Sequence, residues 1–440
     1  MARGAEPGRG AGARAVRSAT LGLVVLLAVS CAPSGEFAAA QVARRADPPL
    51  AAPPVDAAEI PPTLDGPPLW RAPFSSTPKA VGGGFVGPFM PREQGSDLFF
   101  LGVDSGGTTR WSVARNPSCT AFAVTRADGR VLVVLLDSDA APERGIAARR
   151  VVAEAYDPRD GARVWGPVDV PGTLVGPGLV FAETAHSVLS AAHGPGVALD
   201  AATGRVVADE TAGERILHEH DGVVLVERDG TLRAVESATG ETLWSGAELA
   251  APEGFADPGA TVRYGPRPRD GSTGAVVLEW TAADGHTTYT VHGLRSGEPI
   301  TRLDGAEAPA LAGTWDGRVA VVHGTDGGEE VLVAVDAVES RVLWRVPAAG
   351  AELDRVVADT VYLAVADGVW AVGLRTGRSV ARGEWTVPVA GGLGTVLVPV
   401  EPPVGEVLVA LRTARQWSAA RTRERPSMLT GIDRSEPETP

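Results

Sequence analysis

The sequence predicts an all-β fold, a β-propeller of eight four-stranded blades, with seven blades as the alternative. A motif consisting of a turn and a tryptophan recurs at an average spacing of about 44 residues, which is the length of one four-stranded blade. Short apolar runs separated by turn residues fill the intervals between the motifs. No segment of useful length shows a helical period. A chain of 440 residues exceeds the usual size of one hydrophobic core, and blades avoid that limit because each packs locally.

Each motif begins with a turn residue that ends one strand and is usually acidic. A short acceptor side chain can bond the backbone of a tight turn, and a glycine four positions later can adopt a positive φ at little cost. The turn positions are Asp104, Asp157, Asp200, Glu236, Gly293, Asp336, Gly373 and Arg412. The glycines that follow them are Gly161, Gly204, Gly240, Gly297 and Gly377.

The tryptophan of the motif is expected to fasten each blade to the next. An indole buries about 150–250 Å², which corresponds to roughly 4–6 kcal/mol of transfer free energy. A repeat that cannot cover its own apolar face has to stack on its neighbour. The predicted docking residues are Trp111, Trp165, Trp244 and Trp344, whereas Ala208 and Ala381 hold this position in two other units.

Closure of the ring requires one more strand, because an open propeller leaves a bare strand edge. The segment around Trp70 precedes the first full repeat and is predicted to add the outer strand to the last blade. Trp417 is the competing candidate for that place.

Residues 1–31 have the features of an export signal. Four arginines precede the apolar run 21–29, which is about half of the ~20 residues needed to span a bilayer. Small residues then lead to Cys31, and this stretch resembles a bacterial lipobox. The resemblance implies that Cys31 carries a diacylglyceryl group that anchors the protein to a membrane. The alternative is an ordinary cleaved signal with an incidental cysteine.

The remaining chain is divided into three parts. Residues 32–68 are rich in Ala and Pro without a sustained period, and we expect a disordered tether. The propeller is predicted to occupy residues 69–419, and residues 420–440 a polar tail. Insertions at 138–150 and 265–274 are expected to form loops on one rim, where partners could bind.

Composition and single residues restrict the function further. The formal net charge is −14, and the absence of an evident basic patch argues against a nucleic-acid partner. Cys119 is expected to be a small buried hydrophobe, without a disulfide if Cys31 is lipidated. His218 and His220 would share one face of a strand, but a metal would need further ligands. We therefore expect a polar rim there and no metal.

The repeated unit A-x-D-x-x-T-G-x-x-x-W resembles the repeat of PQQ-like propellers. That family includes the quinoprotein alcohol dehydrogenases and the BamB-type lipoproteins of outer-membrane assembly. The resemblance covers the predicted propeller and implies eight blades, with each tryptophan docked onto the next blade. Individual units depart from the pattern, since Gly293, Gly373 and Arg412 replace the acidic residue.

The resemblance does not extend to catalysis. Quinoprotein dehydrogenases hold calcium and the quinone with Glu, Asn and Asp ligands and typically have a vicinal cysteine pair. Here the two cysteines are far apart and Asn116 is the only asparagine. We expect neither PQQ nor calcium, and no catalytic residue is assigned. A PQQ-dependent oxidoreductase and a glycan-binding or glycan-cleaving propeller stay open as alternatives.

The sequence thus predicts an exported, lipid-anchored, non-enzymatic bacterial propeller that acts as a protein-binding or assembly scaffold on the outer face of a membrane. Its partners would be other envelope or secreted proteins, and the membrane through the lipid anchor. The chain is expected to be a monomer. Rim loops and the mouth of the central channel are the surfaces that such folds offer to partners.

Overall fold

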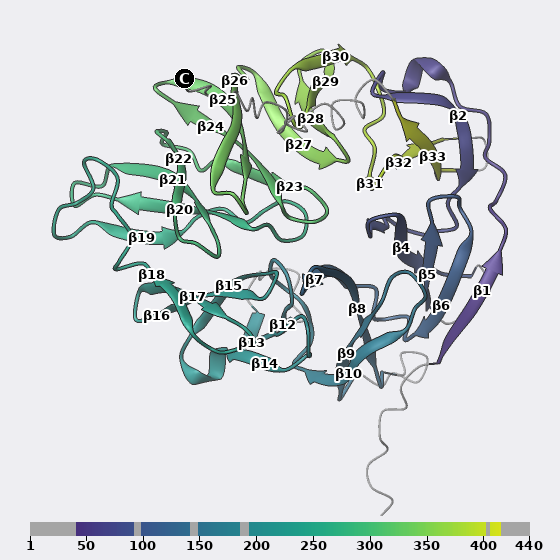
Figure 1. Cartoon of the computed structure of the whole chain (residues 1–440), viewed down its shortest axis with the longest axis horizontal. Helices are drawn as coiled ribbons and strands as arrows, with labels where there is room; N and C mark the ends of the chain where they lie inside the picture. Colours follow the sequence, from purple (N-terminus) through teal and green to yellow (C-terminus); the bar gives the residue numbers. More distant parts are fainter. Residues whose placement is uncertain (1–40, 92–97, 141–147, 185–192, 402–404, 415–440) are drawn as a thin grey trace, which may run out of the picture. The chain divides into compact units, whose positions relative to one another are not determined.

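The computed structural model describes residues 41–91, 98–140, 148–184, 193–401 and 405–414. These residues belong to one compact unit and form eight antiparallel sheets arranged in a ring (Figure 1). The prediction of eight four-stranded blades is confirmed, and the alternative of seven is wrong. In the described part of the chain the helices are short 3-10 turns, η1 (Ala57–Glu59) and η3 (Glu210–Ala212). None has the length and hydrophobicity for a membrane crossing.

In most blades the first strand lies toward the centre of the ring, and later strands lie outward (Figure 1). Blade 1 contains β3 (Lys79–Ala80), β4 (Gly84–Phe89), β5 (Leu98–Asp104) and β6 (Thr109–Arg115), with β1 (Val42–Asp47) as a fifth, outermost strand. Blade 2 contains β7 (Phe122–Ala127), β8 (Arg130–Ser138), β9 (Val151–Tyr156) and β10 (Arg163–Val170). Blade 3 contains β11 (Thr173–Leu174), β12 (Val180–Thr184), β13 (His193–Leu199) and β14 (Val206–Asp209). Blade 4 contains β15 (Arg215–His220), β16 (Val223–Arg228), β17 (Thr231–Glu236) and β18 (Thr242–Ser245).

The second half of the ring repeats this order. Blade 5 contains β19 (Thr261–Tyr264), β20 (Ala275–Thr281), β21 (Thr287–Gly293) and β22 (Pro299–Leu303). Blade 6 contains β23 (Ala310–Gly313), β24 (Val319–Asp326), β25 (Glu329–Asp336) and β26 (Arg341–Pro347). Blade 7 contains β27 (Ala351–Val357), β28 (Thr360–Val365), β29 (Gly368–Gly373) and β30 (Ser379–Gly383). Blade 8 contains β31 (Ala390–Gly391), β32 (Thr395–Val400), β33 (Val407–Thr413) and β2 (Leu64–Arg71).

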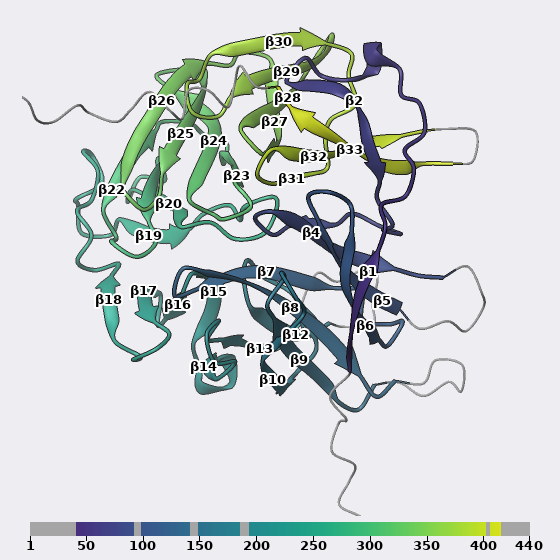
Figure 2. The ribbon, with the colours of Figure 1, turned by 45° about the vertical axis from the view of Figure 1, so that its right-hand side comes forward.

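Blade 8 is completed by the N-terminal part of the chain. β2 pairs with β33 and places Trp70 opposite Ala410, and both views show β2 beside β33 (Figures 1 and 2). Ala410 stands two residues before the turn position Arg412, and the tryptophans of the other blades face the corresponding residue. Trp70 therefore occupies the tryptophan position of the last blade, as predicted. Trp417 lies outside the described residues.

The prediction of a disordered tether at residues 32–68 is wrong for its described part beyond Gln41. β1 pairs with β6, with Val42 opposite Val113, and Leu50 forms a bridge with Arg71. β1 reads VARRAD and shows no apolar alternation, because a strand at the outer edge of a sheet can be polar on most of its surface. The ordered propeller thus begins near Val42. The predicted export signal with Cys31 and the residues after 414 lie outside the described part.

Hydrophobic clusters lie between neighbouring blades. In one of them Leu132 of blade 2 packs with Phe181 of blade 3, and in another Trp70 of blade 8 packs with Phe85 of blade 1. The buried Cys119 belongs to the first cluster and is 7% exposed, as predicted. Each blade therefore covers the apolar face of the next one, and the joints between blades carry the stability of the ring.

Candidate functional site

In blades 1 to 7 the motif turns connect the third and fourth strands, and five of these turns share one geometry. In blade 2 the Gly161 N–H donates to the Asp157 carbonyl at 2.9 Å, and Gly161 has a φ of 72°. The guanidinium of Arg159 hydrogen-bonds the Asp157 carboxylate and lowers the pKa of that carboxyl. The glycine-to-carbonyl bond recurs at Gly204, Gly240, Gly297 and Gly377. The carboxylates of Asp104, Asp200 and Asp336 likewise accept backbone N–H groups of their own turns.

Each motif tryptophan donates its indole N–H to the next blade. Trp244 Nε1 lies 2.7 Å from the carbonyl oxygen of Leu294, the residue directly after the turn position Gly293. A buried indole N–H needs such an acceptor. The equivalent pairs are Trp111 with Pro158, Trp165 with Ala201, Trp344 with Leu374, and Trp70 with Ser105. The last of these pairs joins blade 8 to blade 1 in the same way as the others.

The turn glycine of the next blade lies against the docked indole. A Cβ atom at Gly297 would lie 2.7 Å from Trp244 Cγ, a distance at which one of the two groups has to move. The same close approach occurs between Gly161 and Trp111, Gly204 and Trp165, Gly377 and Trp344, and Gly107 and Trp70. The glycine is therefore required both by its positive φ and by the indole that covers it.

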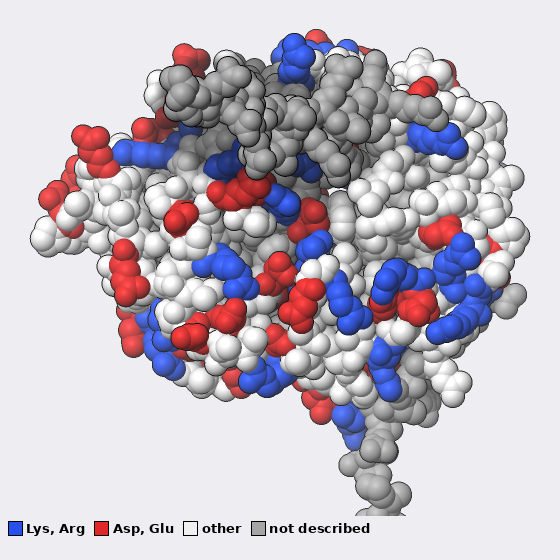
Figure 3. All heavy atoms as spheres, viewed as in Figure 1, with Lys and Arg blue, Asp and Glu red and all other residues white. Residues whose placement is uncertain are grey.

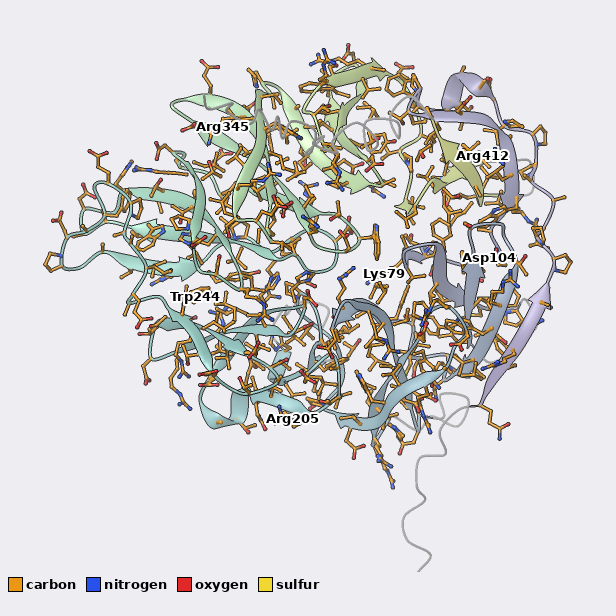
Figure 4. All side chains as sticks on the ribbon, in the orientation of Figure 1. Lys79, Asp104, Arg205, Trp244, Arg345 and Arg412 are labelled. Atoms are coloured by element: carbon orange, nitrogen blue, oxygen red, sulfur yellow. The ribbon has the colours of Figure 1, made fainter. Side chains whose placement is uncertain are left out.

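Gly240 shows what happens where the indole is missing. The preceding blade carries Ala208 at the tryptophan position, and nothing lies within 4 Å of a Cβ atom built at Gly240. At this joint Arg205 Nη2 donates at 2.8 Å to the carbonyl of Ser237, the residue directly after the turn position. Figure 4 labels Arg205 and the docked Trp244. The motif residues thus hold blades together, and a functional site has to be sought elsewhere.

The insertion at 265–274, which we call the channel loop, leaves the inner strand of blade 5 and reaches the inner strands of other blades. Arg267 donates to the Val175 carbonyl of blade 3 at 3.1 Å. The Arg269 N–H donates to the Leu311 carbonyl of blade 6 at 2.8 Å, and its guanidinium binds Glu352 of blade 7 at 2.8 Å. The prediction that this insertion lies on the rim is wrong. Its contacts with three inner strands place it at the ring centre.

His218 and His220 hold the channel loop in place. His218 is 0% exposed, and its Nε2 atom lies 2.8 Å from the Thr273 carbonyl oxygen. His220 Nδ1 lies 2.9 Å from the Ser272 hydroxyl. Burial lowers the pKa of His218 to about 3 and that of His220 to about 4, so both rings are neutral near pH 7. The expected polar rim is therefore wrong, because these histidines are buried.

The ring-centre cavity has a volume of about 650 Å³ and lies between the channel loop and the inner edges of blades 1, 2 and 3. Lys79, the only lysine of the chain, lines it and points toward the ring centre in Figure 4. Its Nζ atom donates to the Phe122 carbonyl at 2.9 Å. Burial lowers the pKa of Lys79, and Asp270 raises it in part. Arg267 and Arg269 line the same cavity.

None of these three cations was predicted from the sequence. The available signal was the occurrence of a single lysine in an arginine-rich chain, which base composition also explains. The second signal was the pair of arginines in the insertion at 265–274. The position of that insertion at the ring centre depends on closure of the ring, so the sequence alone did not reveal it.

A second cavity of about 710 Å³ lies among the turns of blades 2 to 5. Asp221 and Glu236 line it together with Arg205 and Arg295. Arg295 pairs with Glu236 at 2.9 Å, and Arg205 is bound to a backbone carbonyl. Its arginines are thus already engaged. Acidic and basic side chains are also interspersed over the face of the molecule shown in Figure 3.

The other insertion, at 138–150, is described only at its two ends. The Asn116 amide donates to the Ser138 carbonyl at 3.2 Å and to the Ala140 carbonyl at 2.6 Å. The Asp139 carboxylate at the first end of the insertion accepts the N–H of Arg149 at the far end, at 2.8 Å. Asn116 therefore anchors this loop and does not line the ring-centre cavity.

The repeated turn and docked indole define the chain as a PQQ-like β-propeller. The family model described as outer membrane protein assembly factor BamB matches residues 148–382, which is more than half of the chain. The chain therefore belongs to this family. Among solved structures, BamB from Moraxella catarrhalis is similar at 14% identity and a TM-score of 0.35, with 77% of this chain and 95% of that chain covered. No curated protein matches the sequence.

Proposed function

We propose that this protein is a non-enzymatic scaffold that binds other proteins of the bacterial envelope. The observation that carries the proposal is membership in a family described as an outer-membrane assembly factor. The motif carboxylates and indoles have structural roles, because they form hydrogen bonds within turns and to neighbouring blades. This agrees with a scaffold role. Such a fold leaves its rim loops and the ring centre for recognition.

Crosslinking in the native membrane, followed by affinity capture of the tagged full-length chain, tests this role. We expect the same envelope proteins in repeated captures, and we expect excess untagged protein to reduce their recovery. A parallel capture without crosslinker identifies proteins that adhere to the resin. If no partner is enriched reproducibly over that control, the scaffold role is refuted.

We also propose that the chain is exported and held at the extracytoplasmic face of the membrane by a lipid on Cys31. The support is the sequence of residues 1–31, with its arginines, short apolar run and lipobox-like end. The Cys31→Ser variant should leave the membrane fraction and lose the mass of the diacylglyceryl group. Recovery of the unaltered chain in the cytosol with residues 1–31 intact would contradict this proposal.

The protein is further proposed to act without PQQ or calcium. Asn116 is engaged by the insertion at 138–150. Within the described ranges, no group of three or more His, Cys, Asp or Glu side chains is placed to hold a metal ion. Both observations support this proposal. Addition of PQQ and calcium should give no absorbance that stays with the protein during gel filtration, and retained absorbance would favour the oxidoreductase alternative.

A further inference from the structure

The ring-centre cavity contains cationic groups that lack carboxylate partners. Lys79 Nζ has a backbone carbonyl as its hydrogen-bond acceptor, although an ammonium group offers three donors. Arg267 also donates to a backbone carbonyl. Among the described residues, no carboxylate lies within ion-pair distance of either group, whereas Arg269 is paired with Glu352. Most of the described arginines, in contrast, form an ion pair with an acidic side chain.

The lining of the cavity supplies further hydrogen-bond donors. Ser76, Thr77 and Thr120, which carry hydroxyl groups, also line the cavity. Lys79 is fixed by its bond to Phe122 and by the aromatic ring of that residue, whose centroid is 5.0 Å from Nζ. Arg267 is held across the ring centre by its bond to Val175. Both charges are therefore positioned before a ligand arrives, which lowers the entropic cost of binding.

We propose that the ring-centre cavity binds the carboxylate groups of an anionic ligand, with Lys79 and Arg267 as its charged contacts. An arginine can bind a carboxylate through two parallel hydrogen bonds, and a lysine contributes a compact charge. The volume of about 650 Å³ suits a small polycarboxylate or a few residues of an acidic peptide. The site is independent of the scaffold role, since a free polycarboxylate would use the same contacts.

The acidic residues near the site set its specificity. Asp270 acts on Lys79 from the channel loop, and Glu352 neutralises Arg269. Neither one forms an ion pair with Lys79 or Arg267. Asp270 therefore leaves both cations accessible and opposes an incoming carboxylate only by long-range charge repulsion. Removal of the Asp270 charge should therefore strengthen binding, whereas removal of the Lys79 charge should weaken it.

Titration calorimetry on the full-length protein tests this site with citrate and with an acetylated, amidated pentaglutamate peptide. We expect Lys79→Met and Arg267→Ala each to weaken binding about tenfold, and Asp270→Asn to strengthen it several-fold. Arg378→Ala is the matched control, because Arg378 is exposed on the turn between β29 and β30 outside the cavity. Melting curves show whether each variant is folded, and Arg267→Ala keeps the test usable if Lys79→Met unfolds.

The two probes distinguish the source of the carboxylates. Tighter binding of the peptide assigns the cavity to an acidic protein segment, and tighter binding of citrate assigns it to a free polycarboxylate. The site is refuted if neither probe binds, if a pentaglutamine peptide binds equally well, or if both charge-removing variants bind as the parent does. Crosslinked capture with the Arg267→Ala variant separates the two proposals. If calorimetry refutes the carboxylate site but the capture still recovers the same partners, the scaffold role stands.

Discussion

Replacement of Gly297 by alanine tests whether the turn glycines exist for the docked indoles. Gly297 and Gly240 occupy the same motif position, with φ values of 69° and 77°. A Cβ atom at Gly297 would lie 2.7 Å from Trp244 Cγ, while a Cβ atom at Gly240 would meet nothing within 4 Å. The two sites therefore form a matched pair in which backbone strain is shared and only the indole contact differs.

The magnitudes follow from these two terms. An alanine in the left-handed region costs about 1–2 kcal/mol, and this cost applies to both variants. Forcing a methyl group into a packed contact adds about 1–3 kcal/mol, and this cost applies to Gly297→Ala alone. We expect Gly240→Ala to lower the free energy of unfolding by about 1–2 kcal/mol and Gly297→Ala to lower it by about 2–5 kcal/mol.

Urea denaturation followed by tryptophan fluorescence and circular dichroism measures both variants. A double mutant with Trp244→Ala completes the cycle, because removal of the indole also removes the overlap. In that background Gly297→Ala should cost no more than Gly240→Ala does in the parent. Equal effects of the two glycine variants in the parent would refute the reasoning, since they would show that the indole does not restrict the turn.

The remaining predictions concern packing, protonation and closure. Trp244→Ala should lower the free energy of unfolding by about 3–5 kcal/mol through loss of burial and formation of a cavity, and a parental urea midpoint would contradict the docking role. Burial raises the pKa of Glu219 to about 8, so the folded chain keeps a proton that the unfolded chain loses above its ordinary pKa. The contribution of Glu219 to stability is therefore present below about pH 4.5 and is lost as the pH rises to about 8. Glu219→Gln should remove this loss in melting curves recorded between pH 5 and 8, and an unchanged slope would refute the assignment. Deletion of residues 60–75 removes β2 and exposes the edge of β33, so it should lower the melting temperature, and unchanged melting would argue against this closure.

The repeat was predictable because its chemistry is local. An acidic residue, a glycine four positions on and an indole eight positions on belong to one turn and the strand that follows it. The same motif allowed Trp70 to be placed in the last blade, although it lies 342 positions before Arg412 in the sequence. The spacing predicted eight blades with seven as the alternative, since the turn position recurs whether or not the tryptophan is present.

Features that depend on the closed ring were not predictable. β1 has no apolar pattern because it covers only the outer edge of β6, so its composition resembled that of a linker. The channel loop left the same signature as a rim loop, a run of Gly, Pro and Arg between strands. Its direction is set by acceptors on distant inner strands, such as the Val175 and Leu311 carbonyls. Those acceptors come together only after the blades have assembled.

The degenerate repeats are explained by the chemistry of the joints. At two joints that lack the indole, an arginine makes a hydrogen bond across the joint instead. After Ala208 the turn keeps Gly240 without a neighbour and Arg205 supplies the hydrogen bond. After Thr301 the corresponding turn position is Ser340 instead of glycine, with a φ of 47°, and Arg345 of the next blade donates to the Thr301 hydroxyl at 2.7 Å. Arg205 and Arg345 (Figure 4) thus act at joints that lack a tryptophan. Since an exposed guanidinium contributes less than a buried indole, these joints are where the ring should open first.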